Sequence, residues 1–216
     1  MPTITDAVVV GGCLASFTPQ VSAQDRQDIQ DCLLYAELAA NDKYPGQVSK
    51  KVWFDYYQGR LIKAGFTLKA FIAPEPFRVA SIQELLTMSH TVIGRVGYER
   101  LGQCVRETYR ALALDRFAWE FFRGNVARGG QGILKCSPCE RLASGETVVC
   151  LLSVQYGTRV TEQALFLWSE FHHNLEIVPG GGVYAFNRAV FQHYRARVHE
   201  KIESYSAKRL VHTLRF

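Results

Sequence analysis

The residues with the clearest chemical potential are the two cysteines of Cys136-Ser137-Pro138-Cys139. A C-x-x-C turn can hold two sulfurs for zinc or for a redox disulfide. A structural zinc site needs two further ligands, and the sequence contains no second C-x-x-C and no H-x-x-x-H. A thioredoxin-type motif opens a helix, whereas this one follows a short predicted strand. We therefore predict a loop with two thiols and keep metal or redox chemistry as the alternative.

Histidines supply the next candidates. His172 and His173 follow a predicted strand, so we expect two turn residues, with a pH-sensitive contact as the alternative because imidazole titrates close to neutrality. His199-Glu200 begins like a zincin helix, but Glu203 occupies the position at which H-E-x-x-H requires a second histidine. The sequence therefore predicts no metal ligand set.

Two glycine-rich segments, 129–132 and 180–182, lack the spacing of phosphate-binding loops. The second follows Pro179 and is predicted to be a flexible turn. No G-x-S-x-G nucleophile motif occurs either. We predict no catalytic, cofactor-binding or metal residues and no cofactor, and we keep an enzyme with a dispersed site as an alternative.

These residues must be positioned by a β-rich core that runs from Glu146 to Phe186. Within it, residues 147–156 place apolar side chains on both faces, which is typical of a strand covered on both sides. The segments before and after this core have the apolar periodicity of amphipathic helices. Ser81 with Glu84 forms a capping box, which predicts a helix start at that point.

The predicted architecture is one α+β domain over residues 1–216, with a largely antiparallel sheet wrapped by amphipathic helices. The N-terminal half is predicted to be helical and the C-terminal half β-rich. The N-terminal segment 5–17 is expected to be a short strand or buried lead-in, broken by Gly11-Gly12. The other expected parts are a helix-rich region at 20–124 with a strand at 66–73, a β-rich region at 131–186 with strands at 147–156 and 166–171, a helix at 187–207 and a strand at 209–216.

Composition limits the class of protein. Hydrophobic residues make up 48% of the chain and charged residues 21%, as in a globular protein. The net charge of +5 favours acidic partners or anionic lipid but falls short of a nucleic-acid footprint, so nucleic acid is not an expected partner. No apolar stretch reaches the ~18–20 residues that span a bilayer. The oligomeric state does not follow from the sequence.

The N-terminal segment and the cysteines bear on localisation. Residues 7–17 are apolar, but no Lys or Arg precedes Cys13, so we expect no secretory signal. Three of the six cysteines lie within apolar helix or strand patterns, which is typical of an intracellular protein. We predict a protein that is cytoplasmic as synthesised, with signal-independent export left open.

The C-terminal helix carries the candidate binding residues. A basic face is predicted to lie opposite an apolar stripe that includes Phe191 and Val198. Such a face could meet anionic headgroups or a protein partner, and the alternative is a solvated outer face. The candidate lipid- or partner-facing residues are Arg188, Arg195, Arg197, His199 and Lys201.

Two segments carry a resemblance to known proteins. AELAANDKY at 36–44 and WFDYYQGRLIKAGFTL at 53–68 resemble a pattern in bacterial proteins of similar length whose function is uncharacterised. The order of helical hairpin, strand, helices and long strands is also similar, in architecture only, to the Cyt-type cytolysins. That second resemblance implies a sheet surrounded by helices and a protein that acts on membranes.

The leading functional prediction is a non-enzymatic protein that binds a membrane surface or a target cell, as a Cyt-like toxin or virulence factor. In this account, the helices around Leu33, Trp53 and Leu101 would detach to lie in the membrane interface. The alternatives are a protein-binding or immunity-like module that acts from its folded surface, and the enzyme with a dispersed site.

Overall fold

The computed structural model describes residues 4–45, 49–129, 133–156, 175–205 and 211–214. Its centre is an eight-stranded mixed sheet in the order β3-β7-β6-β5-β2-β1-β8, with β4 also paired to β7. The strands are β1 (Asp6–Val10), β2 (Cys13–Phe17), β3 (Phe66–Ile72), β4 (Phe77–Val79), β5 (Ile133–Arg141), β6 (Thr147–Tyr156), β7 (Leu175–Phe186) and β8 (Val211–Thr213). Every pairing is antiparallel except that of β2 with β5, which is parallel. The predicted α+β domain with a largely antiparallel sheet is confirmed.

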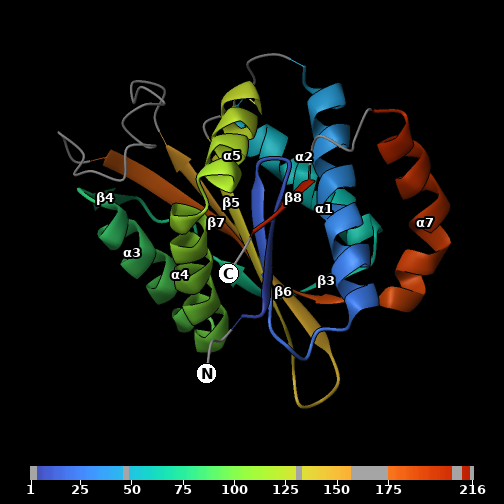
Figure 1. The fold of residues 1–216 in the computed structure, drawn as a ribbon, viewed down its shortest axis with the longest axis horizontal. Helices are drawn as coiled ribbons and strands as arrows, with labels where there is room; N and C mark the ends of the chain where they lie inside the picture. Colours follow the sequence, from blue (N-terminus) through green and yellow to red (C-terminus); the bar gives the residue numbers. More distant parts are fainter. Residues whose placement is uncertain (1–3, 46–48, 130–132, 157–174, 206–210, 215–216) are drawn as a thin grey trace.

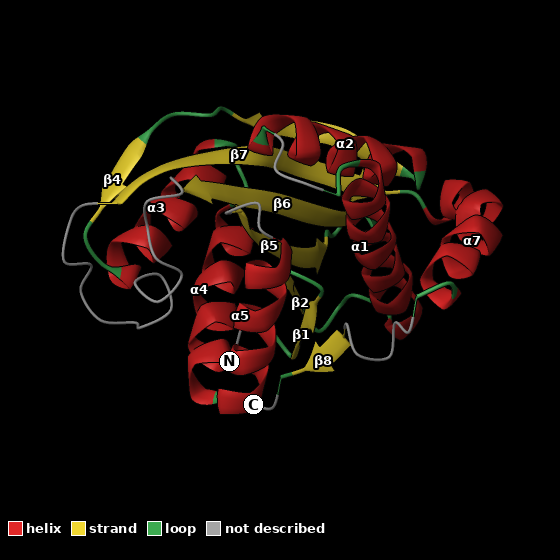
Figure 2. Cartoon of the chain, turned by 90° about the horizontal axis from the view of Figure 1, so that it is seen from above, coloured by secondary structure: helices red, strands yellow, loops and turns green. Residues whose placement is uncertain are grey.

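Helices cover both faces of this sheet (Figures 1 and 2). They are α1 (Ala23–Lys43), α2 (Lys50–Lys63), α3 (Ile82–Arg95), α4 (Glu99–Leu114), α5 (Arg116–Gly129) and α7 (Arg188–Glu203). One core lies between the sheet and α3, α4 and α5, and a second lies between the other face and α1, α2 and α7. Strand β6 is buried on both faces and mostly apolar on both, as predicted from residues 147–156, and β5 beside it is also buried along nearly its whole length.

Local sequence explains where several helices begin. The Ser81 hydroxyl accepts a hydrogen bond from the Glu84 backbone N–H at 3.2 Å, and the Glu84 carboxylate accepts one from the Ala80 N–H at 2.8 Å. Each side chain therefore satisfies a backbone donor at the start of α3, and Glu84 reaches the N–H one residue before the cap rather than that of Ser81, which the standard capping box uses. Ser22 caps α1 in the same way, by accepting from the Asp25 N–H.

Two predictions about turns and loops are wrong. Residues 136–139 lie inside strand β5, paired with β2 on one side and with β6 on the other. Pro138 reads as a loop residue in the sequence, but the sheet accepts it between the bridges that Cys136 and Cys139 make with β6. The glycines of 180–182 also lie inside a strand, β7, which pairs with β6 and β3. Glycine is required at 181 because a Cβ atom there would come 1.9 Å from the Leu151 carbonyl oxygen of β6.

Three further strand predictions concern residues 5–17, the final strand and residues 166–171. Residues 6–17 form two paired strands, the hairpin β1–β2, instead of a short strand or lead-in. The chain turns at the predicted break, where Gly11 has a φ of +56°. Of the predicted final strand at 209–216, the structure describes residues 211–214, and Val211–Thr213 form β8. The predicted strand at 166–171 and the histidines His172 and His173 lie outside the described residues.

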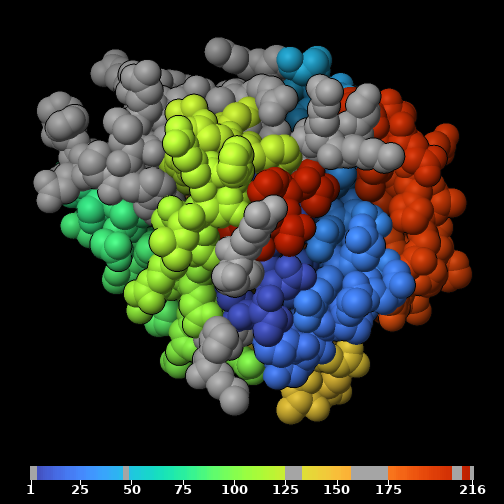
Figure 3. All heavy atoms as spheres, in the orientation of Figure 1, coloured from blue at the N-terminus to red at the C-terminus, as the bar shows by residue number. Residues whose placement is uncertain are grey.

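Helix α7 is the element that positions the candidate site. It lies at one margin of the molecule beside α1, as the space-filling view shows (Figure 3). Only Phe191 and Val198 of α7 are buried. In the part of the chain that the structure describes, no helix combines the length and the apolar character needed to cross a membrane.

Candidate functional site

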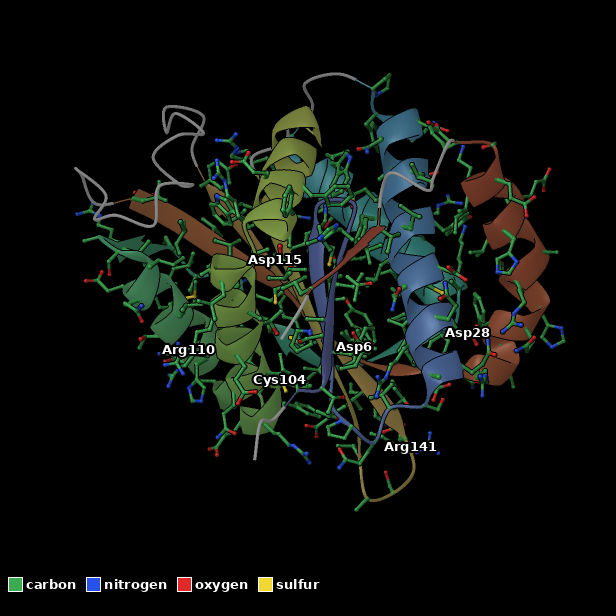
Figure 4. The ribbon with its side chains drawn as sticks, viewed as in Figure 1. Asp6, Asp28, Cys104, Arg110, Asp115 and Arg141 are labelled. Carbon is green, nitrogen blue, oxygen red and sulfur yellow. The ribbon has the colours of Figure 1, made fainter. Side chains whose placement is uncertain are left out.

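Two of the predicted α7 residues, Arg188 and Arg195, point at carboxylates of α1 rather than at solvent. Arg195 Nη2 lies 2.6 Å from Asp28 Oδ1, and Arg188 bridges Asp28 Oδ2 at 3.2 Å and Asp25 Oδ1 at 3.6 Å. Asp28 lies between the two helices and its side chain is 2% exposed (Figure 4). Two guanidinium groups therefore compensate one carboxylate that has left water.

The same interface continues toward the end of α7. His199 Nε2 lies 3.3 Å from Asp31 Oδ2, and Lys201 forms an ion pair with Asp42. Burial raises the pKa of the Asp31 carboxyl above its ordinary value, although His199 and a hydrogen bond from Gln27 act in the opposite direction. Four of the five candidate residues thus already have an intramolecular partner, while their role toward lipid or a partner protein stays a prediction.

The position of the basic residues relative to the apolar stripe differs from the prediction. The Arg195 guanidinium lies over the ring of Phe191, 5.3 Å from its centroid, so the cation and the buried apolar residue share one side of α7. The long methylene stem of arginine allows this, because it can cover an apolar side chain while its charged end reaches a carboxylate.

The fifth candidate residue, Arg197, lines a hollow of about 520 Å³ between α1, α2 and α7. We call it the cationic hollow, and its lining residues are Tyr35, Ala39, Asp42, Lys43, Tyr56, Arg60, Arg197, Glu200, Lys201 and Ser204. The Arg60 guanidinium lies 4.4 Å from the centroid of the Tyr56 ring. Among the described residues, no carboxylate forms an ion pair with Lys43, Arg60 or Arg197.

Sequence reasoning missed Lys43 and Arg60 as members of this hollow. Each reads as an ordinary surface residue at the end of its own helix, and only the packing of α1, α2 and α7 brings them near Arg197. The signal that could have found them is the excess of basic residues near the ends of these helices.

A second hollow, of about 510 Å³, lies near the start of α1 and includes Asp25, Arg141, Thr147 and Arg188 in its lining. The Asp25 carboxylate accepts hydrogen bonds from Arg141 and Thr147 at 3.4 and 3.3 Å and pairs with Arg188. The cations here are therefore already matched by a buried carboxylate, in contrast to Lys43, Arg60 and Arg197 of the cationic hollow.

The sheet face under α1 and α2 carries a buried ion pair that sequence reasoning also missed. Lys135 Nζ lies 3.4 Å from Glu37 Oε1, and the two side chains are 4% and 9% exposed. The Gly12 N–H donates to both Glu37 oxygens at 3.0 Å, and the Lys135 ammonium lies 4.6 Å from the Trp53 ring centroid. The signal for it was a lysine and a glutamate inside otherwise apolar stretches, ILKC and AELAA.

Cys13 lies next to this pair, with its sulfur 3.3 Å from the Ser137 hydroxyl. Burial raises the pKa of the Cys13 thiol to about 11, so the sulfur stays protonated and is a poor nucleophile at neutral pH. Neither of the two hollows is lined by Cys13, Lys135 or Glu37. We therefore interpret this cluster as part of the core.

The geometry of β5 separates the two cysteines of the C-x-x-C motif. Cys136 belongs to the core under α3, α4 and α5, and Cys139 belongs to the core under α1 and α2. Residues three apart in a strand point to opposite faces of the sheet, so these sulfurs cannot share a metal ion or a disulfide in this fold. Burial raises the pKa of both thiols well above its ordinary value. Within the described ranges, no group of three or more His, Cys, Asp or Glu side chains could hold a metal ion.

The fold and this site define a single-domain α+β protein with a mixed sheet between two helical layers. Comparison with known proteins adds little to that class. No protein-family model matches the chain, and no curated protein matches its sequence. A distant structural match is the Evf virulence factor, with a TM-score of 0.41 and 12% sequence identity, covering 93% of this chain and 83% of that one.

Proposed function

We propose that the protein binds anionic membrane surfaces in its folded form, through the side of the molecule that carries the cationic hollow. The observation that supports this is the convergence of Lys43, Arg60 and Arg197 from three different helices, without a carboxylate partner among the described residues. Each such cation near an anionic leaflet contributes about 1 kcal/mol to binding at physiological salt.

Burial favours binding by the folded protein over detachment of the predicted helices. Trp53, Leu33 and Leu101 are each 2% exposed or less. Transferring each of these side chains back to water would cost about 1.5–3 kcal/mol before any contact with lipid compensated it. Helix α7, which buries two side chains, can meet a membrane without disturbing either core.

Vesicle flotation tests this proposal. We expect the protein to float with vesicles that contain phosphatidylserine and to stay in solution with phosphatidylcholine alone, and binding should weaken as salt rises because exposed charges are screened. The variant R60A/R197A should lose most of this binding. The matched control is R110A, which removes an exposed arginine from α4, on the other side of the molecule (Figure 4). Equal loss in R110A and R60A/R197A would contradict the proposal.

A second candidate function, a protein-binding module, is favoured by a different surface. Leu114 and Phe117 are 87% and 79% exposed where α4 ends and α5 begins. The Asp115 carboxylate accepts a hydrogen bond from the Ala118 N–H at this junction, which fixes the turn that leaves both apolar side chains outside. A stoichiometric protein complex that forms without lipid and is lost in L114S/F117S would favour this function.

A further inference from the structure

The cationic hollow has the dimensions of a ligand site and not only of a charged surface. Its volume of about 520 Å³ lies inside the range of roughly 300–1,000 Å³ that is usual for small-ligand sites. Its walls come from α1, α2 and α7, so the lining side chains are carried by three regular elements rather than by loops. We infer that this hollow binds a phosphate monoester group, an inference that rests on the proposed membrane function and names the headgroup chemistry.

Arg60 is held in place for such a ligand. Its guanidinium lies 4.4 Å from the centroid of the Tyr56 ring, and Tyr56 in turn meets Tyr44 edge to face, at 5.6 Å between centroids. Stacking uses the flat face of the guanidinium and leaves its N–H groups in the plane. These donors can form paired hydrogen bonds with the oxygens of a phosphate.

The charge balance of the walls selects for a strongly charged ligand. Four cations and two carboxylates line the hollow, and Lys201 is paired with Asp42. Lys43, Arg60 and Lys201 lie in the last turns of α1, α2 and α7, where each also offsets the negative end of a helix dipole. Among the lining cations, Arg60 and Arg197 carry the guanidinium groups that can bind phosphate oxygens in pairs, and Glu200 opposes them.

A ligand with one negative charge gains little from such a balance. A phosphate monoester carries about −1.5 to −2 charges at neutral pH and offers three acceptor oxygens, so it can engage Arg60 and Arg197 together. A phosphodiester or carboxylate headgroup provides about one charge. We therefore expect phosphatidic acid, or another lipid with a terminal phosphate, to bind better than phosphatidylserine.

The experiment compares vesicles of phosphatidylcholine mixed with phosphatidic acid or with phosphatidylserine, matched for zeta potential. The full-length protein should bind the phosphatidic acid vesicles about tenfold more tightly, and R60A/R197A should remove this preference, as expected for the loss of charge-assisted hydrogen bonds. E200Q should strengthen it, because it removes the opposing carboxylate and keeps the shape. R110A controls for the loss of a surface charge outside the hollow. A thermal unfolding curve for each variant shows whether the fold is intact.

A second arm separates the two sources of the phosphate group. Inorganic phosphate, titrated against sodium chloride at equal ionic strength, should displace the protein from both vesicle types more strongly than chloride does, because both rely on Arg60 and Arg197 of the hollow. Equal binding to both vesicle types, unaltered by E200Q, would overturn the hollow as a phosphate site and leave the proposed membrane function standing. Saturable phosphate binding that R60A/R197A abolishes, without binding to any vesicle, would support the hollow and overturn the membrane function.

Discussion

Within the described part of the chain, helix α7 carries arginines of two kinds, those that are paired with a carboxylate and one that is not. At the α1–α7 interface, Arg188 and Arg195 are matched by Asp25 and Asp28, and this pairing fixes the helix to the body of the protein. In the cationic hollow, Arg197 is brought near other cations and has no carboxylate partner among the described residues. The comparison shows that the partner supplied by a neighbouring helix decides whether an arginine stabilises the fold or is available for a ligand.

The largest effect should come from removing the carboxylate at the centre of the interface. We expect D28A to lower the free energy of unfolding by about 3 kcal/mol. This value is near the lower end of the roughly 3–5 kcal/mol that a broken buried ion pair costs, because Arg188 and Arg195 can still reach water. Urea unfolding measures this. The control is D55A, which removes an exposed carboxylate paired with Lys51 and should cost less than about 1 kcal/mol. Equal losses in the two variants would show that the interface does not stabilise the fold.

An intermediate effect should follow from turning the cationic hollow into a second paired interface. Ala39 lines the hollow, and A39E would supply the carboxylate that Arg60 and Arg197 lack. We expect binding to anionic vesicles to fall about tenfold, equivalent to about 1.4 kcal/mol, with little change in stability. The uncharged variant A39Q, of matching size, should bind like the unmodified protein. A comparable loss in A39Q would point to blocked space instead of charge.

The smallest effect concerns pH and the pair of Asp31 with His199. Because burial raises the pKa of Asp31 in the folded protein, the folded state binds this proton more tightly than the unfolded state. The contribution of Asp31 to stability should therefore fall as pH rises from the ordinary value of 3.8 through the raised one. D31N lacks this pH dependence. Its free energy of unfolding should therefore rise relative to that of the unmodified protein as pH increases through this range, by less than about 1 kcal/mol because the pair is partly exposed. Urea unfolding at several pH values gives the difference, and parallel curves for the two proteins would contradict it.

Periodicity and capping predicted most helices because these signals are local. The serine and glutamate that cap the start of α3 act within one helical turn. The C-x-x-C and glycine segments were predicted wrongly for the opposite reason. Pro138 and Gly181 favour turns when considered alone, and the strands on both sides hold them in the sheet.

The candidate site was only partly accessible to sequence reasoning. The sequence indicated that α7 is basic and named Arg197, but it could not supply Lys43 and Arg60, which are about 150 and 140 residues away along the chain. It also could not show that Arg188, Arg195 and His199 face α1. Helical spacing orders residues around one helix, whereas the direction of each face depends on the neighbouring helix.

The sequence by itself determined the elements of this protein: the amphipathic helices, the strands that are apolar on both faces and the excess of basic charge. The reason is that side-chain periodicity, capping and composition act over a few residues. The tertiary structure alone decided which charges are neutralised and which remain available. Coulomb interactions depend on distance in space, and the packing of α1, α2 and α7 sets the distances that separate the paired interface from the cationic hollow.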